Sequence, residues 1–209
     1  MIEVMRKKAL IVLITAMLAV GIVATGCGSS KNPNNNNAGF VEEVQSEAKD
    51  DVAGSTENAE AKPYVLTFTG TTLAGDTLTS ECFADAKLTM VNVWATFCGP
   101  CINEMPDLGE IAAEYDAADF QLIGIISDVI EGDEGETFTE AQEIIAQTGA
   151  NYTHLLLNEE LYVNLVGASD SVPTTYFFNE KGELLGYLVG AQSKDVWKQI
   201  IDELLAEVK

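Results

Sequence analysis

Basic side chains are scarce in this chain of 209 residues. Eleven lysines and arginines stand against 33 aspartates and glutamates, which gives a formal net charge of −22 at pH 7. Nucleic-acid binding depends on basic residues that neutralise phosphates, so a nucleic-acid partner is excluded. The same acidity excludes binding to an anionic membrane surface through charge, so any membrane attachment needs another origin.

Long apolar stretches are scarce as well. One lies at residues 9–24, "ALIVLITAMLAVGIVA", directly after Arg6, Lys7 and Lys8. Its 16 residues are slightly short for a transmembrane helix, which needs about 20. A basic start followed by an apolar stretch and small residues is typical of a secretory signal peptide.

The tetrapeptide "ATGC" ends this segment at Cys27 and resembles the lipobox of bacterial lipoproteins. In that family the signal peptide is cut before the cysteine, and the cysteine sulfur carries a lipid. The resemblance implies a signal peptide over residues 1–26 and a lipid anchor on Cys27, although Ala24 stands where the family usually has leucine. A signal peptide cut elsewhere and an uncleaved anchor are the alternatives.

Histidine and cysteine are too few for a typical zinc site. The chain has one histidine, His154, and four cysteines, at positions 27, 82, 98 and 101. A structural zinc site takes four such ligands in paired spacings, and lipidation of Cys27 would leave three cysteines. We therefore expect no metal ion and no cofactor. Cys82 is expected to be a small buried apolar residue, and His154 a hydrogen-bonded, partly buried side chain outside the site.

The composition changes at residue 64. Residues 28–63 are rich in Asn, Ser, Glu and Ala and contain one aromatic residue, Phe40. Such a segment buries too little apolar surface to offset the cost of ordering it. We expect residues 27–63 to form a disordered tether with a mean reach of roughly 30–35 Å, and residues 64–209 to form the folded domain.

Strand and helix patterns alternate through this domain. The apolar run "KLTMVNVWA" at residues 87–95 predicts a strand buried on both faces, and "FQLIGIIS" at 120–127 predicts a second one. Apolar residues at helical spacing predict helices over 100–118, 137–149 (capped by Thr137 or Thr139) and 193–208. Short strands are expected at 64–70, 76–83 and 151–158, a short helix at 159–167, and a closing hairpin at 174–190. The pattern predicts an α/β fold with a central mixed β-sheet flanked by helices.

The pair Cys98 and Cys101 in "WATFCGPC" lies between the buried strand and the first long helix. As a structural disulfide, the pair would close a loop too short to remove much chain entropy. At the start of a helix, free backbone N–H groups and the helix dipole stabilise a thiolate and lower the pKa of a cysteine thiol. This placement favours thiol–disulfide exchange over a purely structural role.

The segment "VNVWATFCGPCINEMP" at residues 91–106 resembles the active-site segment of the thioredoxin superfamily, and in particular of extracytoplasmic TlpA/ResA-like thiol–disulfide oxidoreductases. Trp94 lies four residues before Cys98, and Pro106 matches the proline inside the family's active-site helix. "SVPTTYFFN" at 171–179 resembles the loop that carries the family's cis-proline, with Pro173 at that position. The resemblance covers residues 64–209 and implies a thioredoxin-like fold with an N-terminal β-hairpin extension.

The resemblance also implies roles for individual residues. Cys98 would be the attacking thiolate and Cys101 the resolving thiol. Where thioredoxins keep a buried aspartate, this chain has Asn92, and Glu104 matches a glutamate that the ResA-like branch uses as proton acceptor. The remaining residues implied to contact substrate are Trp94, Gly99, Pro100, Val172 and Pro173.

These features predict a membrane-tethered extracytoplasmic thiol–disulfide oxidoreductase that reduces disulfides of exported proteins. Family resemblance implies apocytochromes awaiting haem or a methionine sulfoxide reductase as substrates, and a membrane electron donor of the CcdA/DsbD kind. Three alternatives stay open. The same chemistry could form disulfides instead. A peroxiredoxin-like peroxidase is the second, although its "PxxxTxxC" pattern does not precede Cys98. The third is a surface-binding lipoprotein with an unreactive cysteine pair.

Overall fold

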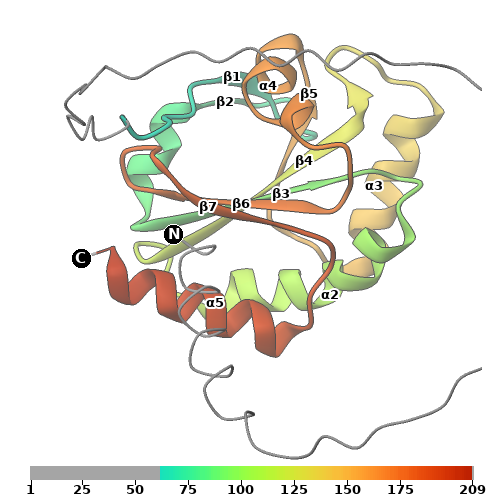
Figure 1. The fold of residues 1–209 in the computed structure, drawn as a ribbon. Coiled ribbons are helices and arrows are strands. Elements are labelled where there is room, and N and C mark those ends of the chain that lie inside the picture. The colour runs from blue at the N-terminus through green and yellow to red at the C-terminus, as the bar shows by residue number, and fades with distance from the viewer. Residues whose placement is uncertain (1–61, 209) are drawn as a thin grey trace, which may run out of the picture. The chain divides into compact units, whose positions relative to one another are not determined.

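The structure is a computed structural model that describes residues 62–208, drawn in colour in Figure 1. The expected signal peptide, the lipidation site at Cys27 and all but the last two residues of the expected tether lie outside the described residues. Within residues 62–208, no helix combines the length and the apolar character needed to cross a membrane.

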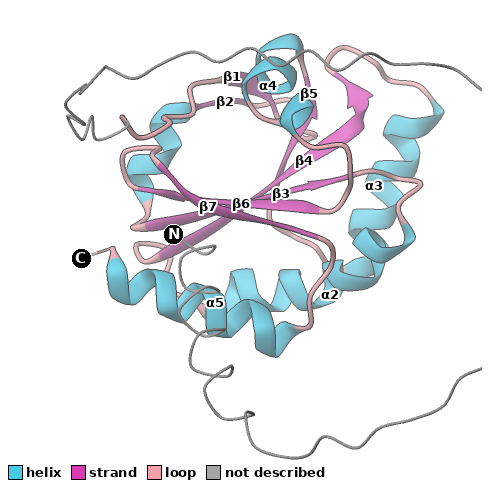
Figure 2. Ribbon diagram, viewed as in Figure 1, coloured by secondary structure: helices cyan, strands magenta, loops and turns pink. Residues whose placement is uncertain are grey.

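A five-stranded mixed sheet with the strand order β5-β4-β3-β6-β7 forms the centre of the domain (Figure 2). Strands β3, β4 and β5 are parallel, whereas β6 is antiparallel to β3 and β7 is antiparallel to β6. Their bounds are Leu88–Trp94, Phe120–Ile130, Thr153–Leu157, Thr174–Asn179 and Leu184–Val189. Every residue of the central strand β3 is buried, as its continuous apolar run predicts.

The N-terminal extension is a two-stranded antiparallel hairpin, formed by β1 (Thr69–Thr71) and β2 (Thr77–Thr79). The second strand is shorter than expected, because residues 80–85 form the 3-10 helix η1 (Ser80–Asp85) instead. The Thr79 side chain accepts a hydrogen bond from the backbone N–H of Glu81 and so caps this helix.

Five further helical segments surround the sheet: α2 (Gly99–Glu114), α3 (Glu136–Thr148), α4 (Glu159–Asn164), the 3-10 helix η2 (Val166–Ala168) and α5 (Lys194–Glu207). Pro106 lies inside α2. The expected threonine cap of α3 is wrong, because Gly135 occupies the N-cap position without a side-chain hydrogen bond. The expected stop is confirmed: Gly149 ends α3 with φ 69°, in the left-handed region that favours glycine.

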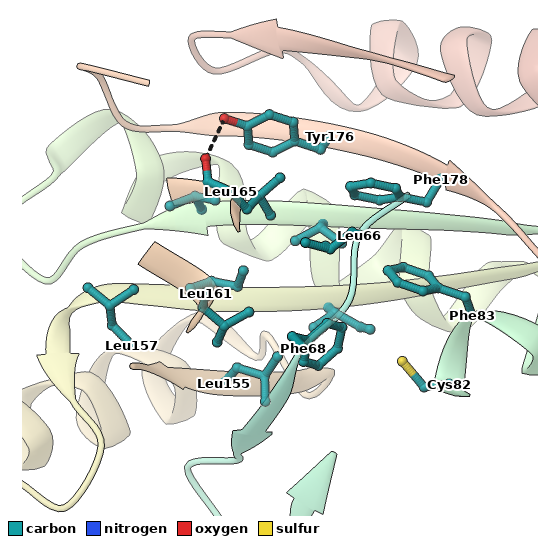
Figure 3. Packing of buried hydrophobic residues seen from close by; sticks show 14 residues of the cluster. Leu66, Phe68, Cys82, Phe83, Leu155, Leu157, Leu161, Leu165, Tyr176 and Phe178 are labelled. Carbon is teal, nitrogen blue, oxygen red and sulfur yellow. Dashed lines mark hydrogen bonds between the residues drawn. The ribbon is translucent and has the colours of Figure 1, made fainter. Parts of the chain in front are cut away.

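Each face of the sheet has its own apolar cover. Figure 1 shows α2 and α5 under one face, with the hairpin and α4 over the other. Figure 3 shows the core on the hairpin side of the sheet, which includes Phe68, Phe83, Phe178 and, at the edge of the cluster in this view, Cys82. Cys82 is 7 % exposed and forms no disulfide, and burial raises the pKa of its thiol to about 11. The expectation of a small buried apolar residue is confirmed.

Candidate functional site

Cys98 and Cys101 form a disulfide at the start of α2, with 5.3 Å between their Cα atoms. Cys98 is the N-cap residue of this helix, and its Sγ accepts a hydrogen bond from the backbone N–H of Cys101 at 3.2 Å. Gly99 and Pro100 form the first turn, where proline is tolerated because its missing N–H has no helical partner. One free N–H group of the helix start, that of Cys101, therefore points at the Cys98 sulfur.

The two cysteine residues differ slightly in exposure. Cys98 is 6 % exposed, whereas Cys101 is fully buried. Cys98 is therefore the more exposed residue of a pair that is largely covered in the disulfide form. This difference agrees with the order of roles that the sequence resemblance implies for the pair.

The peptide bond between Val172 and Pro173 is cis, as the resemblance implies. This bond directly precedes β6, which pairs with β3, and Cys98 follows β3. Val172 packs against the apolar cluster that contains both cysteines of the disulfide. The sheet thus brings the cis-proline loop, more than seventy positions later in the chain, to the disulfide.

Glu104 lies one helical turn beyond Cys101 and is 4 % exposed. Its carboxylate accepts hydrogen bonds from Asn92 Nδ2 (3.2 Å), the Gln192 backbone N–H (3.1 Å) and Trp197 Nε1 (3.3 Å). Burial raises the pKa of the Glu104 carboxyl, and the three hydrogen bonds oppose this rise without cancelling it. Glu104 is therefore not an ordinary solvated carboxylate on a helix surface.

Glu104 also borders a hollow of about 320 Å³, formed with Pro100, Asn103, Asp107 and the segment at 191–192. The buried carboxylate therefore lies at the wall of a hollow that is open to solvent. Such a position allows proton exchange with water while the sulfurs stay covered.

Asn92 occupies the β3 position where thioredoxins keep an aspartate, and its side chain cannot titrate. Its amide also donates a hydrogen bond to Thr175 Oγ1 at 3.0 Å. Its carbonyl oxygen Oδ1 is buried and has no hydrogen-bond partner among the described residues. Asn92 thus acts as a donor that supports the charged form of Glu104.

Trp94 is fully buried, in the same apolar cluster as the disulfide. Its indole Nε1 donates to His154 Nδ1 at 3.2 Å, and His154 Nε2 lies 3.0 Å from the Ala150 carbonyl oxygen. Because the indole can only donate, the imidazole is neutral and carries its proton on Nε2. The substrate contact expected for Trp94 stays a prediction, and in this structure its side chain does not reach the surface. The hydrogen-bonded His154 is confirmed and is almost completely buried.

Phe97 is a functional candidate that was not among the expected site residues. It directly precedes Cys98, and 78 % of its surface is exposed. With Val172 it lines a pocket of about 280 Å³ beside the cis-proline loop. An exposed aromatic side chain next to a reactive sulfur is a typical contact for a partner protein.

The sheet order, the helix-capping disulfide and the cis-proline loop define a thioredoxin-like α/β domain. The profile of the AhpC/TSA family matches residues 62–185, more than half of the chain. The chain belongs to this family.

Similar proteins of known structure or name agree with this fold. A crystal structure of a thiol:disulfide interchange protein of the thioredoxin family from Chlorobium tepidum TLS is 25% identical, with a TM-score of 0.60, over 70% of this chain and 99% of that one. The thiol:disulfide interchange protein HelX of Rhodobacter capsulatus is 30% identical over 122 residues, 58% of this chain and 63% of HelX. The thiol-disulfide oxidoreductase ResA of Bacillus anthracis is 23% identical over 109 residues, 52% of this chain and 58% of ResA. The chain thus matches about six tenths of the length of these two relatives.

Proposed function

We propose that this protein is a thiol–disulfide oxidoreductase that reacts through Cys98 and Cys101. The observation that carries the proposal is the position of Cys98, which is the N-cap of α2 and the more exposed residue of the pair. The cis-proline loop packs against the same apolar cluster as Cys98, where its backbone would pair with an extended partner segment. The names of HelX and ResA support the same reading.

In the reducing direction, the Cys98 thiolate attacks one sulfur of a partner disulfide. The partner's S–S bond breaks, its other sulfur leaves as a thiolate, and a mixed disulfide to Cys98 forms. The Cys101 thiolate then attacks the Cys98 sulfur, closes the Cys98–Cys101 bond and releases the second partner sulfur. Two electrons pass from the protein dithiol to the partner, and the helix N–H groups stabilise the attacking thiolate.

Glu104 is the proposed proton acceptor for Cys101. The Cys101 thiol is fully buried and must lose its proton before it can attack the mixed disulfide. The raised pKa of Glu104 makes its carboxylate a stronger base than a solvated glutamate. The hollow beside Glu104 would let the proton leave to water.

We further propose that residues 1–26 are a signal peptide, that a lipid on Cys27 holds the protein at the outer face of the cell membrane, and that residues 27–63 are a tether for the domain at 64–209. The substrates would be exported proteins with disulfides, apocytochromes among them, and electrons would come from a membrane protein of the CcdA/DsbD kind. Replacement of Cys27 by serine should abolish incorporation of labelled fatty acid and release the protein from the membrane fraction. Unchanged labelling of the Cys27→Ser variant would contradict the anchor.

The direction of the reaction is tested by the reduction potential of the Cys98–Cys101 pair, measured by equilibration with glutathione and alkylation of free thiols. The measurement uses the Cys82→Ser variant, so that alkylation of the third described thiol does not add to the signal of the Cys98–Cys101 pair. A value near the thioredoxin end, about −270 mV, supports a reductant, whereas a value near the DsbA end, about −120 mV, would make the protein a disulfide-forming catalyst. A pair that cannot be reduced under mild conditions would contradict the enzyme itself.

Substrates are identified with a trapping variant. Cys101→Ser should accumulate mixed disulfides with partners on Cys98, because the resolving thiol is missing. The matched control is Cys98→Ser, which keeps Cys101 but has no accessible attacking sulfur. Equal capture by both variants would contradict the proposed order of attack. Rapid turnover of peroxide by the reduced protein would instead support a peroxidase.

A further inference from the structure

A pocket of about 280 Å³ lies beside the disulfide, between Phe97 on one side and the cis-proline loop on the other. The side chains of Phe97, Val166 and Val172 provide apolar walls. Because Phe97 adjoins Cys98 and Val172 adjoins Pro173, a residue next to the attacked cysteine of a bound partner would lie over this pocket.

The polar groups of the pocket are mostly engaged already. The hydroxyls of Ser169 and Thr174 lie 2.8 Å apart, and both donate to the Ser171 carbonyl oxygen, at 3.1 and 2.6 Å. Asp170 is the exception: its residue is exposed, and its carboxylate has no hydrogen bond or ion pair to any described residue. The pocket therefore presents one free group of full negative charge above apolar walls.

No basic residue of the described chain lines this pocket. Residues 62–208 contain five lysines, at positions 62, 87, 181, 194 and 198, and no arginine. Three of these lysines are already paired with carboxylates far from the pocket: Lys87 with Asp119, Lys194 with Glu110 and Glu114, and Lys198 with Glu114. No lysine within residues 62–208 lines the pocket or forms an ion pair with Asp170.

We propose that this pocket is a specificity subsite for a lysine or arginine side chain next to the attacked cysteine of the substrate. The aliphatic stem of such a side chain packs on Val166 and Val172, while its charged end reaches Asp170. The exposed ring of Phe97 adds a cation–π contact. This proposal rests on the proposed oxidoreductase activity and names the substrate class of that site: cationic disulfide segments.

Other occupants fit the pocket less well. A glutamate or aspartate would meet the Asp170 carboxylate and the acidic domain around it, so like charges would repel. A purely aliphatic side chain would use the walls and leave Asp170 without a partner. Of the common side chains, only lysine and arginine match both the apolar stem and the charged end of the pocket.

The test uses the full-length protein, reduced and freed of reductant, and three peptides. Each peptide carries one cysteine as the mixed disulfide with thionitrobenzoate, and the residue next to the cysteine is lysine, norleucine or glutamate. Norleucine keeps a linear aliphatic stem and lacks the charge. Attack by Cys98 on the peptide sulfur releases thionitrobenzoate, whose absorbance gives the rate.

We expect the lysine peptide to react about three- to ten-fold faster than the norleucine peptide in second-order rate constant, with the glutamate peptide slowest. Added salt should reduce the lysine preference. The Asp170→Asn variant should bring the ratio of lysine to norleucine close to one. The matched control, Asp116→Asn, removes the same charge beyond the far end of α2 and should keep the ratio.

Two results would overturn the subsite: equal rates for lysine and norleucine in the unmodified protein, or a preference that survives in Asp170→Asn. Failure of the proposed function gives a different result, because no peptide would then react faster with the protein than with a simple thiol at the same concentration.

Discussion

His154 provides a direct test of how the fold treats a buried titratable group. It is the only histidine of the chain, so its ring signals can be assigned without ambiguity. The ring lies against Gly124, where a Cβ atom would come within 2.2 Å of His154 Nδ1. Burial lowers the pKa of the imidazole to about 4, from an ordinary value of 6.5.

The size of the effect follows from this difference in pKa. Between pH 6.5 and about 4 the unfolded chain binds a proton at His154 and the folded chain does not. The folded state therefore loses stability as the pH falls through this window, by about 1.4 kcal/mol per pH unit and about 3 kcal/mol in total. Below pH 4 both states are protonated, and the loss from this residue is complete.

The assay combines a ring titration by NMR with urea unfolding of the unmodified protein and a His154→Asn variant from pH 7 to pH 4. The asparagine oxygen replaces Nδ1 as acceptor for Trp94 and does not titrate. Because the carboxylates titrate in both proteins, the difference between their free energies of unfolding should fall by about 3 kcal/mol over this range. A ring pKa near 6.5 in the folded protein, or a constant difference, would refute the reasoning.

Three further experiments test the site and its support. Glu104→Gln keeps an amide oxygen for the hydrogen-bond donors and removes the base, so closure of the disulfide should slow by about 10²–10⁴-fold. Accumulation of the mixed disulfide in rapid-quench samples measures this rate, and an unchanged rate would rule out Glu104 as the proton acceptor. Cys82, with a pKa raised to about 11, should resist iodoacetamide in the reduced, folded protein and react once urea unfolds it; mass analysis of labelling in the native state decides this. Gly124→Ala forces a methyl group against the His154 ring and should destabilise the fold by about 1–3 kcal/mol. A Gly99→Ala variant, with no atom within 4 Å of the new Cβ, is the matched control for urea unfolding.

Much of the architecture followed from local patterns in the sequence. The continuous apolar run at residues 87–95 predicts a doubly buried strand, and β3 is fully buried at the centre of the sheet. The hairpin of β6 and β7 and the helix after Cys98 lie close to where their sequence periodicity predicts them. The errors, such as the cap of α3 and the length of β2, occur at the ends of elements, where competing local hydrogen bonds decide.

The candidate site also has features that follow from local sequence patterns and features that do not. The sequence by itself determined the chemistry: two cysteines at a strand-to-helix junction, a proline loop to cover them and a glutamate one turn further along. The cysteine pair and the glutamate depend on spacing within a few residues, which the backbone geometry of one helix converts directly into proximity. The proline loop lies more than seventy positions away from Cys98 and was predicted from the family resemblance.

Only the tertiary structure decided how far each site residue is buried and which distant side chains it contacts. Glu104 is buried because Trp197, 93 positions later, donates to its carboxylate across α2 and α5. Trp94 is hidden because β5 brings His154 against it. Phe97 and Asp170 share a pocket because β3 and β6 are neighbours in the sheet. Burial and charge partners of this kind depend on residues far apart in the chain, and no local pattern encodes which distant segments the fold will pack together.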